Sequence, residues 1–109
     1  MTESTIYQLL ASLAGGRVYP YVAPQNTPPP WVIFSLPSDV TADTFGGAGE
    51  SRVSIQVDAY ALTVDEARTI RDQAIAALTP LGIGNIRKIP GYEPDTRLYR
   101  ATLDAQAIA

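Results

Sequence analysis

Apolar and polar residues alternate strictly between positions 52 and 61. One set contains only apolar side chains, and its members are Val53, Ile55, Val57, Ala59 and Ala61. The other set is polar or amphipathic, and its members are Arg52, Ser54, Gln56, Asp58 and Tyr60. A period of two residues is that of a β-strand, in which successive side chains point to opposite faces of the sheet. The segment therefore predicts a strand with one face on the core.

A helix is predicted directly after this strand. Thr63 at the N-cap with Glu66 three residues later forms a capping box, and Asp65 and Glu66 lie at the positive end of the helix dipole. Pro80 and Gly82 predict the end of the helix. The stripe expected to face inward consists of Ala67, Ile70, Ala74, Ala77 and Leu78. Its small residues allow the helix to lie close to a sheet.

An earlier helix is predicted at about residues 3–14. Its apolar stripe has the i, i+3, i+4, i+7 spacing and consists of Ile6, Leu9, Leu10 and Leu13. Thr2 or Ser4 can cap its start, and Gly15 with Gly16 predicts its end. Residues 17–20 are expected to form a short extended piece. The proline-rich stretch that follows, PYVAPQNTPPP at 20–30, predicts an extended connector because proline fixes φ and lacks a backbone donor.

The connector leads into a predicted strand at 31–36 with apolar residues on both faces, so we expect both faces to be covered. Residues 37–50 read as a long, glycine-containing, flexible link between strands. Near the end of the chain we expect a hairpin, with strands at 85–90 and 96–105 around a turn at 91–95. Its inward set is expected to be Tyr99, Ala101, Leu103 and Ala105, and the last four residues to fray.

These elements predict an α+β fold in the order α-β-β-α-β-β. Two helices would pack on one face of a mainly antiparallel sheet of four or five strands. The length of 109 residues fits one domain, so we expect a single domain over residues 1–109.

Composition narrows the chemistry. The chain has no cysteine and no histidine, which removes disulfides, thiolate nucleophiles and the commonest general base and metal ligand. The net charge of −3 argues against broad binding of nucleic acid. No apolar run approaches the roughly 20 residues that cross a bilayer, and the N-terminus lacks the basic start of a secretory signal. We therefore expect an intracellular protein with no cofactor, no metal and no membrane contact.

Several segments resemble reactive sites only superficially. The glycine stretch at 44–49 leads into a strand and lacks the Lys-Ser/Thr of a phosphate-binding loop. Asp65 and Glu66 have a capping role, and we expect mid-strand Asp58 to pair with one of Arg52, Arg97 or Arg100. Glu93 and Asp95, in the 93–97 segment, fit a Pro-Asp turn. We expect Lys88 to be a solvent-exposed lysine on a strand. An enzyme built on a carboxylate pair is thus disfavoured.

Arginine, tyrosine and tryptophan are enriched among the residues that dominate protein interfaces. This directs attention to Arg17, Trp31, Tyr60, Arg97, Tyr99 and Arg100. Trp31 and Tyr99 fit the core equally well, and both interpretations stay open.

Short motifs along the chain resemble those of a known family. They are RVYP at 17–20, PWV at 30–32, VDAY at 57–60, EA at 66–67 and DT-x-LYR at 95–100. Their order and spacing over about residues 4–105 are similar to the phage tail-completion or tail terminator family, of the head–tail joining type that includes the terminators of lambda-like phages. No single motif is diagnostic, so the resemblance lies in their succession.

The resemblance implies a structural virion protein rather than an enzyme. Such proteins form a ring, usually a hexamer, that caps the tail tube, ends its polymerisation and meets the head-completion or connector protein, while DNA only passes through the lumen. It also implies assembly in the host cytoplasm and a place at the tail end of the virion, of a phage or a prophage. The residues expected at subunit or tube contacts are Arg17, Trp31, Phe45, Arg52, Gln56, Asp58, Tyr60, Arg97 and Arg100.

Two alternatives remain. One is a neck protein of the same particle, a head-closure or adaptor ring. The other is a peptide-binding interaction module that uses the 20–30 connector or an exposed sheet edge.

Overall fold

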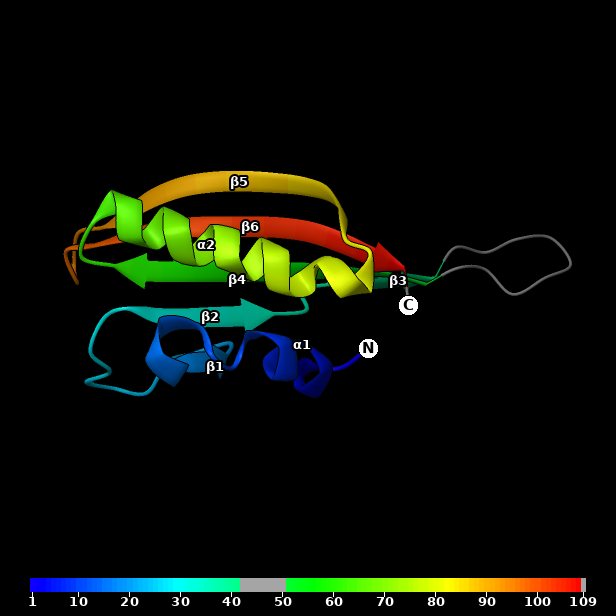
Figure 1. Ribbon diagram of the computed structural model, residues 1–109, viewed down its shortest axis with the longest axis horizontal. Coiled ribbons are helices and arrows are strands. Elements are labelled where there is room, and N and C mark those ends of the chain that lie inside the picture. Colours follow the sequence, from blue (N-terminus) through cyan, green and yellow to red (C-terminus); the bar gives the residue numbers. More distant parts are fainter. Residues whose placement is uncertain (42–50, 109) are drawn as a thin grey trace, which may run out of the picture.

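The computed structural model describes residues 1–41 and 51–108 (Figure 1). Two α-helices, α1 and α2, and two short 3-10 turns, η1 and η2, accompany six strands in the described part. In chain order the elements are α1 (Glu3–Leu10), η1 (Leu13–Gly16), β1 (Val18–Pro20), β2 (Trp31–Ser35), β3 (Asp39–Thr41), β4 (Ser51–Ala61), α2 (Val64–Leu78), η2 (Thr79–Leu81), β5 (Gly84–Glu93) and β6 (Leu98–Ile108). The predicted α+β class is confirmed.

The strands form one sheet in the order β1-β2-β4-β6-β5, and β3 pairs with β4 beyond the end of β2. β1 runs parallel to β2, and all other pairs are antiparallel. The longest pairing joins β4 to β6, from Arg52 opposite Ile108 to Ala61 opposite Tyr99. These two strands, which the 62–97 segment separates in sequence, form the middle of the sheet.

The strand pattern differs from the prediction in three places. The extended piece at 17–20 joins the sheet as β1 because Val18 is buried, so the sheet is mixed and has six strands. Residues 39–41, within the expected 37–50 link, form β3, and 42–50 lie outside the described residues. The hairpin strands are longer than predicted, and the expected fraying before Ile108 is wrong because Ala107 is buried against the core.

Both helices pack on one face of the sheet, as predicted. The register brings Val57 between Phe34 of β2 and Leu103 of β6 on that face. The core gathers around this line, and its largest fully buried side chains are Ile6, Leu10, Val32, Phe34, Ile55, Val57, Leu78 and Leu103. All five apolar residues of the alternating set in β4 are buried. Tyr99 was expected inside but is 36% exposed, because it lies at the end of β6 and packs on Tyr92.

Helix α1 is shorter than the predicted 3–14. Thr2 and Thr5 form a capping box at its start. The helix ends at Leu10 because the chain turns into η1, where Ala14 (φ +50°), Gly15 and Gly16 all have left-handed backbone conformations. Glycine tolerates such angles at little cost, which explains why the chain stops its helix there.

Helix α2 follows the predicted pattern closely. The Thr63 hydroxyl accepts a hydrogen bond of 3.1 Å from the backbone N–H of Glu66, which is one half of the predicted capping box, and among the described residues no Glu66 side-chain bond returns to the Thr63 N–H. Gly82 (φ +69°) terminates η2. The buried side includes one residue that the stripe analysis omitted, Arg71, whose guanidinium reaches Asp72 at 3.1 Å. Within the described ranges, neither helix has the length and apolarity to cross a bilayer.

Thr63→Ala should lower the free energy of unfolding by about 1 kcal/mol, because the Glu66 N–H loses its side-chain acceptor. Urea denaturation followed by circular dichroism measures the change. Thr63→Ser keeps the acceptor and should remain close to wild type, and equal losses in both variants would contradict the capping role.

Phe34→Ala should lower the free energy of unfolding by roughly 3–5 kcal/mol, since the ring is fully buried between α1 and the sheet. Ile89→Ala, at a partly exposed position of β5, should cost at most about 1 kcal/mol. The same urea experiment measures both, and a Phe34 effect no larger than that of Ile89 would be inconsistent with this core.

Candidate functional site

One face of the sheet carries no helix, and we call it the helix-free face. Its side chains alternate with those of the core along each strand. The members on β2, β4 and β6 are Trp31, Ile33, Ser35, Ser54, Gln56, Asp58, Tyr60, Arg100, Thr102, Asp104 and Gln106. The register aligns them in rows that run across the strands.

The first row joins Trp31, Tyr60 and Arg100. The rings of Trp31 and Tyr60 stack with centroids 5.3 Å apart and planes 26° from parallel. Arg100 lies beside them, opposite Gly91 of β5, and its Nη1 donates to Glu93 Oε1 at 2.6 Å. The guanidinium passes close over Gly91, since a Cβ added there would come within 2.8 Å of Arg100 Nη2. A side chain at position 91 would therefore require the Arg100 head to move.

Two donors in this row have no hydrogen-bond partner within the described part of the chain. They are the indole Nε1 of Trp31 and the Nε of Arg100, and both atoms are buried. A buried donor without an acceptor costs free energy, and such groups in native proteins call for an explanation. Acceptors supplied from outside the chain are one explanation.

The second row is anchored by Asp58. Its Oδ1 accepts a short hydrogen bond from Thr102 Oγ1, and its Oδ2 accepts one of 3.2 Å from Gln56 Nε2. Ile33 and Ile89 flank this polar pair on the neighbouring strands. Because Thr102 is almost fully buried, the carboxylate satisfies a hydroxyl that would otherwise lack a partner.

The two ends of the helix-free face differ in chemistry. At the aromatic end, Val22 and Ala23 line a hollow with Trp31 and Tyr60. At the other end, polar side chains line a shallow hollow of about 390 Å³, which includes Gln56, Asn85, Arg87, Asp104 and Gln106. Asn85 donates to Gln106 at 3.0 Å across this hollow. The face therefore offers aromatic stacking at one end and amide hydrogen bonding at the other.

The structure places the predicted contact residues in different settings. The helix-free face holds Trp31, Gln56, Asp58, Tyr60 and Arg100. Arg52 is exposed at the far end of β4, and Arg97 is exposed in the β5–β6 turn with φ +58°. Arg17 lies elsewhere, and its Nε donates to the Pro30 carbonyl at 2.8 Å. Phe45 lies outside the described residues.

The expected ion pair of Asp58 with an arginine is wrong. Among the described residues Asp58 has only the neutral donors Thr102 and Gln56, and Arg100 turns to Glu93 across the hairpin. Lys88 is exposed as expected, and its Nζ lies 3.8 Å from Asp72 Oδ1. The acids at 93–97 divide between β5 and the turn, as a structural role predicts.

The Tyr60 phenol has a raised pKa. Burial raises the pKa of its phenol, the negative charge of Asp58 adds to the rise, and Arg100 opposes it. The hydroxyl therefore stays protonated and able to donate at neutral pH. In the described part of the chain, no group of three or more His, Cys, Asp or Glu side chains is placed to hold a metal ion.

Sequence reasoning missed Thr102 and the Trp31–Tyr60 stack. Thr102 lies on the polar side of the alternation in β6, which could have shown that it faces away from the helices. The stack depends on the β2–β4 register, which places Trp31 opposite Tyr60. No local pattern contains that register, so the pair was not visible before the structure.

Comparison with known proteins adds an independent finding. No curated protein matches this chain. Seven chains of solved structures match it. One, from a structure described as "Virion of native gene transfer agent (GTA) particle", aligns with a TM-score of 0.68 and 20% identity, covering 94% of this chain and 90% of that one. At this identity the likeness shows a shared fold.

The family comparison goes further. The family model described as tail completion protein gp17 matches residues 5–109, which is nearly the whole chain. The resemblance found in the order of the short motifs is thereby confirmed. The chain belongs to the tail completion protein gp17 family, a family of structural phage tail proteins.

Proposed function

We propose that this chain assembles into a ring, with six copies as the expected number, that caps the end of a tail tube. In this role it would stop the addition of tube subunits and offer the surface to which the head-completion or connector protein attaches. Membership of the tail completion family supports the proposal. The fold it shares with a protein of a gene transfer agent virion supports a place in a virion.

The observation that carries the proposal is the helix-free face. It spans the central strands, exposes a stacked aromatic pair, and holds two buried donors that have no acceptor within the described chain. Stacked aromatics and arginine are the side chains that contribute most at protein interfaces. We therefore assign this face, with Arg97 and Arg52 at its margins, to contacts with neighbouring subunits or the tube.

The charge of the chain suits the passage of DNA through such a ring. With Arg52 at its margin, the helix-free face balances three arginines, Arg52, Arg87 and Arg100, against Asp58, Glu93 and Asp104. These six charges sum to zero, so the net charge of −3 comes from other residues of the chain. An excess of carboxylates on the lumen wall would repel phosphate and keep DNA from being held. A lumen lined mainly by arginine would contradict this part of the proposal.

The main rival is an adaptor or head-closure ring of the neck, which would use the same kind of surface. Electron microscopy of particles assembled without the gene separates the two. A tail terminator predicts overlong tails, because nothing stops tube growth. Tails of normal length beside unjoined heads would show that the chain acts in the neck instead.

Gln56→Lys should abolish complementation of a strain that lacks the gene, because it buries a new charge in the centre of the helix-free face on assembly. Gln73→Lys is the matched control, since Gln73 is exposed on α2. Thermal melts should show both variants folded. Equal complementation by both variants would remove the helix-free face from the assembly contacts.

A further inference from the structure

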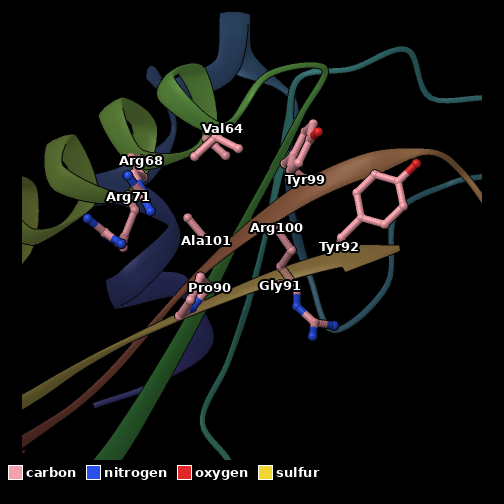
Figure 2. Close-up of a pocket in the computed structure, with 10 residues that line it drawn as sticks. Val64, Arg68, Arg71, Pro90, Gly91, Tyr92, Tyr99, Arg100 and Ala101 are labelled. Atoms are coloured by element: carbon pink, nitrogen blue, oxygen red, sulfur yellow. The ribbon is translucent and has the colours of Figure 1, made fainter. Parts of the chain in front are cut away.

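A groove lies between α2 and β5 on the opposite side of the sheet (Figure 2). Its volume is about 380 Å³. It exists because the helix layer is narrower than the sheet: α2 packs over β4 and β6, and no helix of the described part packs over β5. The helix side of β5 is therefore open along one edge of the molecule.

The groove has an apolar floor and a cationic wall. Small or rigid residues form the floor, including Ala67, Pro90 and Ala101. Tyr92 and Tyr99 close one end with ring centroids 5.0 Å apart. The charged residues that line the groove are Arg68, Arg71 and Arg100.

The two arginines of α2 supply the positive charge that reaches the groove. The Arg100 head extends away from α2 (Figure 2), toward Glu93 on the other face of the sheet. Arg71 bonds Asp72 through Nε and Nη2. Arg68 is exposed and forms no ion pair with another described residue. The lining therefore suits a segment that combines apolar side chains with a carboxylate.

The opposite edge of the same sheet has that complementary chemistry. Around α1 and the end of β1, two large side chains are exposed: Tyr7 (43%) and Tyr21 (56%). Glu3 lies among them, and its Oε2 accepts a hydrogen bond of 2.8 Å from the Tyr21 hydroxyl. Backbone hydrogen bonding, and then this hydroxyl, lower the pKa of Glu3, so it is charged at neutral pH.

The other charged groups before Asp39 are the α-amino group of Met1 and the guanidinium of Arg17, and Arg17 Nε donates to the Pro30 carbonyl. We call Glu3, Tyr7 and Tyr21 the α1-edge patch. It offers aromatic rings and a carboxylate, whereas the groove offers an apolar floor and arginines, and the two lie at the β1 and β5 ends of the strand order.

We propose that the groove between α2 and β5 receives the α1-edge patch of a second copy of this chain, with Arg68 facing the partner's carboxylate at position 3. Two different patches at opposite edges of one molecule make a head-to-tail contact, which is the kind that closes a ring by rotation. The inference rests on the proposed ring and assigns its subunit contact. It leaves the helix-free face for the tube.

Charge exchange tests the pairing. Arg68→Glu and Glu3→Arg should each weaken self-association about tenfold or more, because each places like charges across the contact. The double variant Glu3→Arg/Arg68→Glu should recover most of the loss. Lys88→Glu is the matched control, since it makes the same charge change at an exposed position of β5 that lies outside both the groove and the helix-free face. Sedimentation velocity on the full chain, alone and with purified tail tubes, measures each effect.

Disulfide trapping tests the geometry in a chain with no native cysteine. The variant Glu3→Cys/Arg68→Cys should give a ladder of covalent oligomers under mild oxidation. Glu3→Cys/Gln73→Cys, with its second cysteine on exposed α2 outside the groove, should not. Ladder formation together with rescue by charge exchange supports the contact. Glu3, Arg68 and Gln73 all lie outside the core, so circular dichroism should show both variants folded.

The other outcomes separate this contact from the ring itself. If Arg68→Glu forms rings with unchanged affinity and Glu3→Cys/Arg68→Cys gives no ladder, the groove contact is overturned while the ring stands. If Arg68→Glu forms normal rings that no longer bind tubes, the tube protein occupies the groove. That result also overturns the proposed subunit contact. No association of any variant, with tubes present or absent, overturns the ring and the contact together.

Discussion

The antiparallel pairing of β4 with β6 is the constraint on which the rest of the structure depends. Its register, from Arg52–Ile108 to Ala61–Tyr99, aligns the alternation of both strands, so every apolar residue of one faces the same side as its partner in the other. A shift by one residue would turn both sets over. This pairing therefore decides which side of the sheet receives the helices and which side remains available for assembly.

The widths of the two layers explain where the remaining surfaces lie. The helices cover β1, β2, β4 and β6 but leave β5 open, so the groove and the helix-free face come from the same packing arrangement. Each surface also holds arginine and tyrosine, which suit contacts with other proteins. A structural tail protein of this family needs such surfaces, and a chain without histidine or cysteine can supply them.

The sequence predicted what local periodicity can encode. The two faces of β4, the cap at Thr63 and the apolar side of α2 were visible because each depends on neighbours within four residues. The Trp31–Tyr60 stack, the Asp58–Thr102 bond and the α2–β5 groove depend on register and layer width between distant segments. Charge alone predicted that Asp58 pairs with an arginine. In the fold, Asp58 instead accepts a hydrogen bond from the buried hydroxyl of Thr102. The sequence thus predicted several residues of the candidate site, but it did not predict how these residues contact one another.

The single tryptophan of the chain, Trp31, offers the most direct measurement of the central claim, that the helix-free face is an assembly surface. Replacing it with 5-hydroxytryptophan allows its fluorescence to be excited selectively when purified tail tubes are present. The account predicts that binding to the tubes shifts the emission to shorter wavelength and protects the indole of residue 31 from quenching by acrylamide. Binding that leaves both the emission and the quenching unchanged would contradict it.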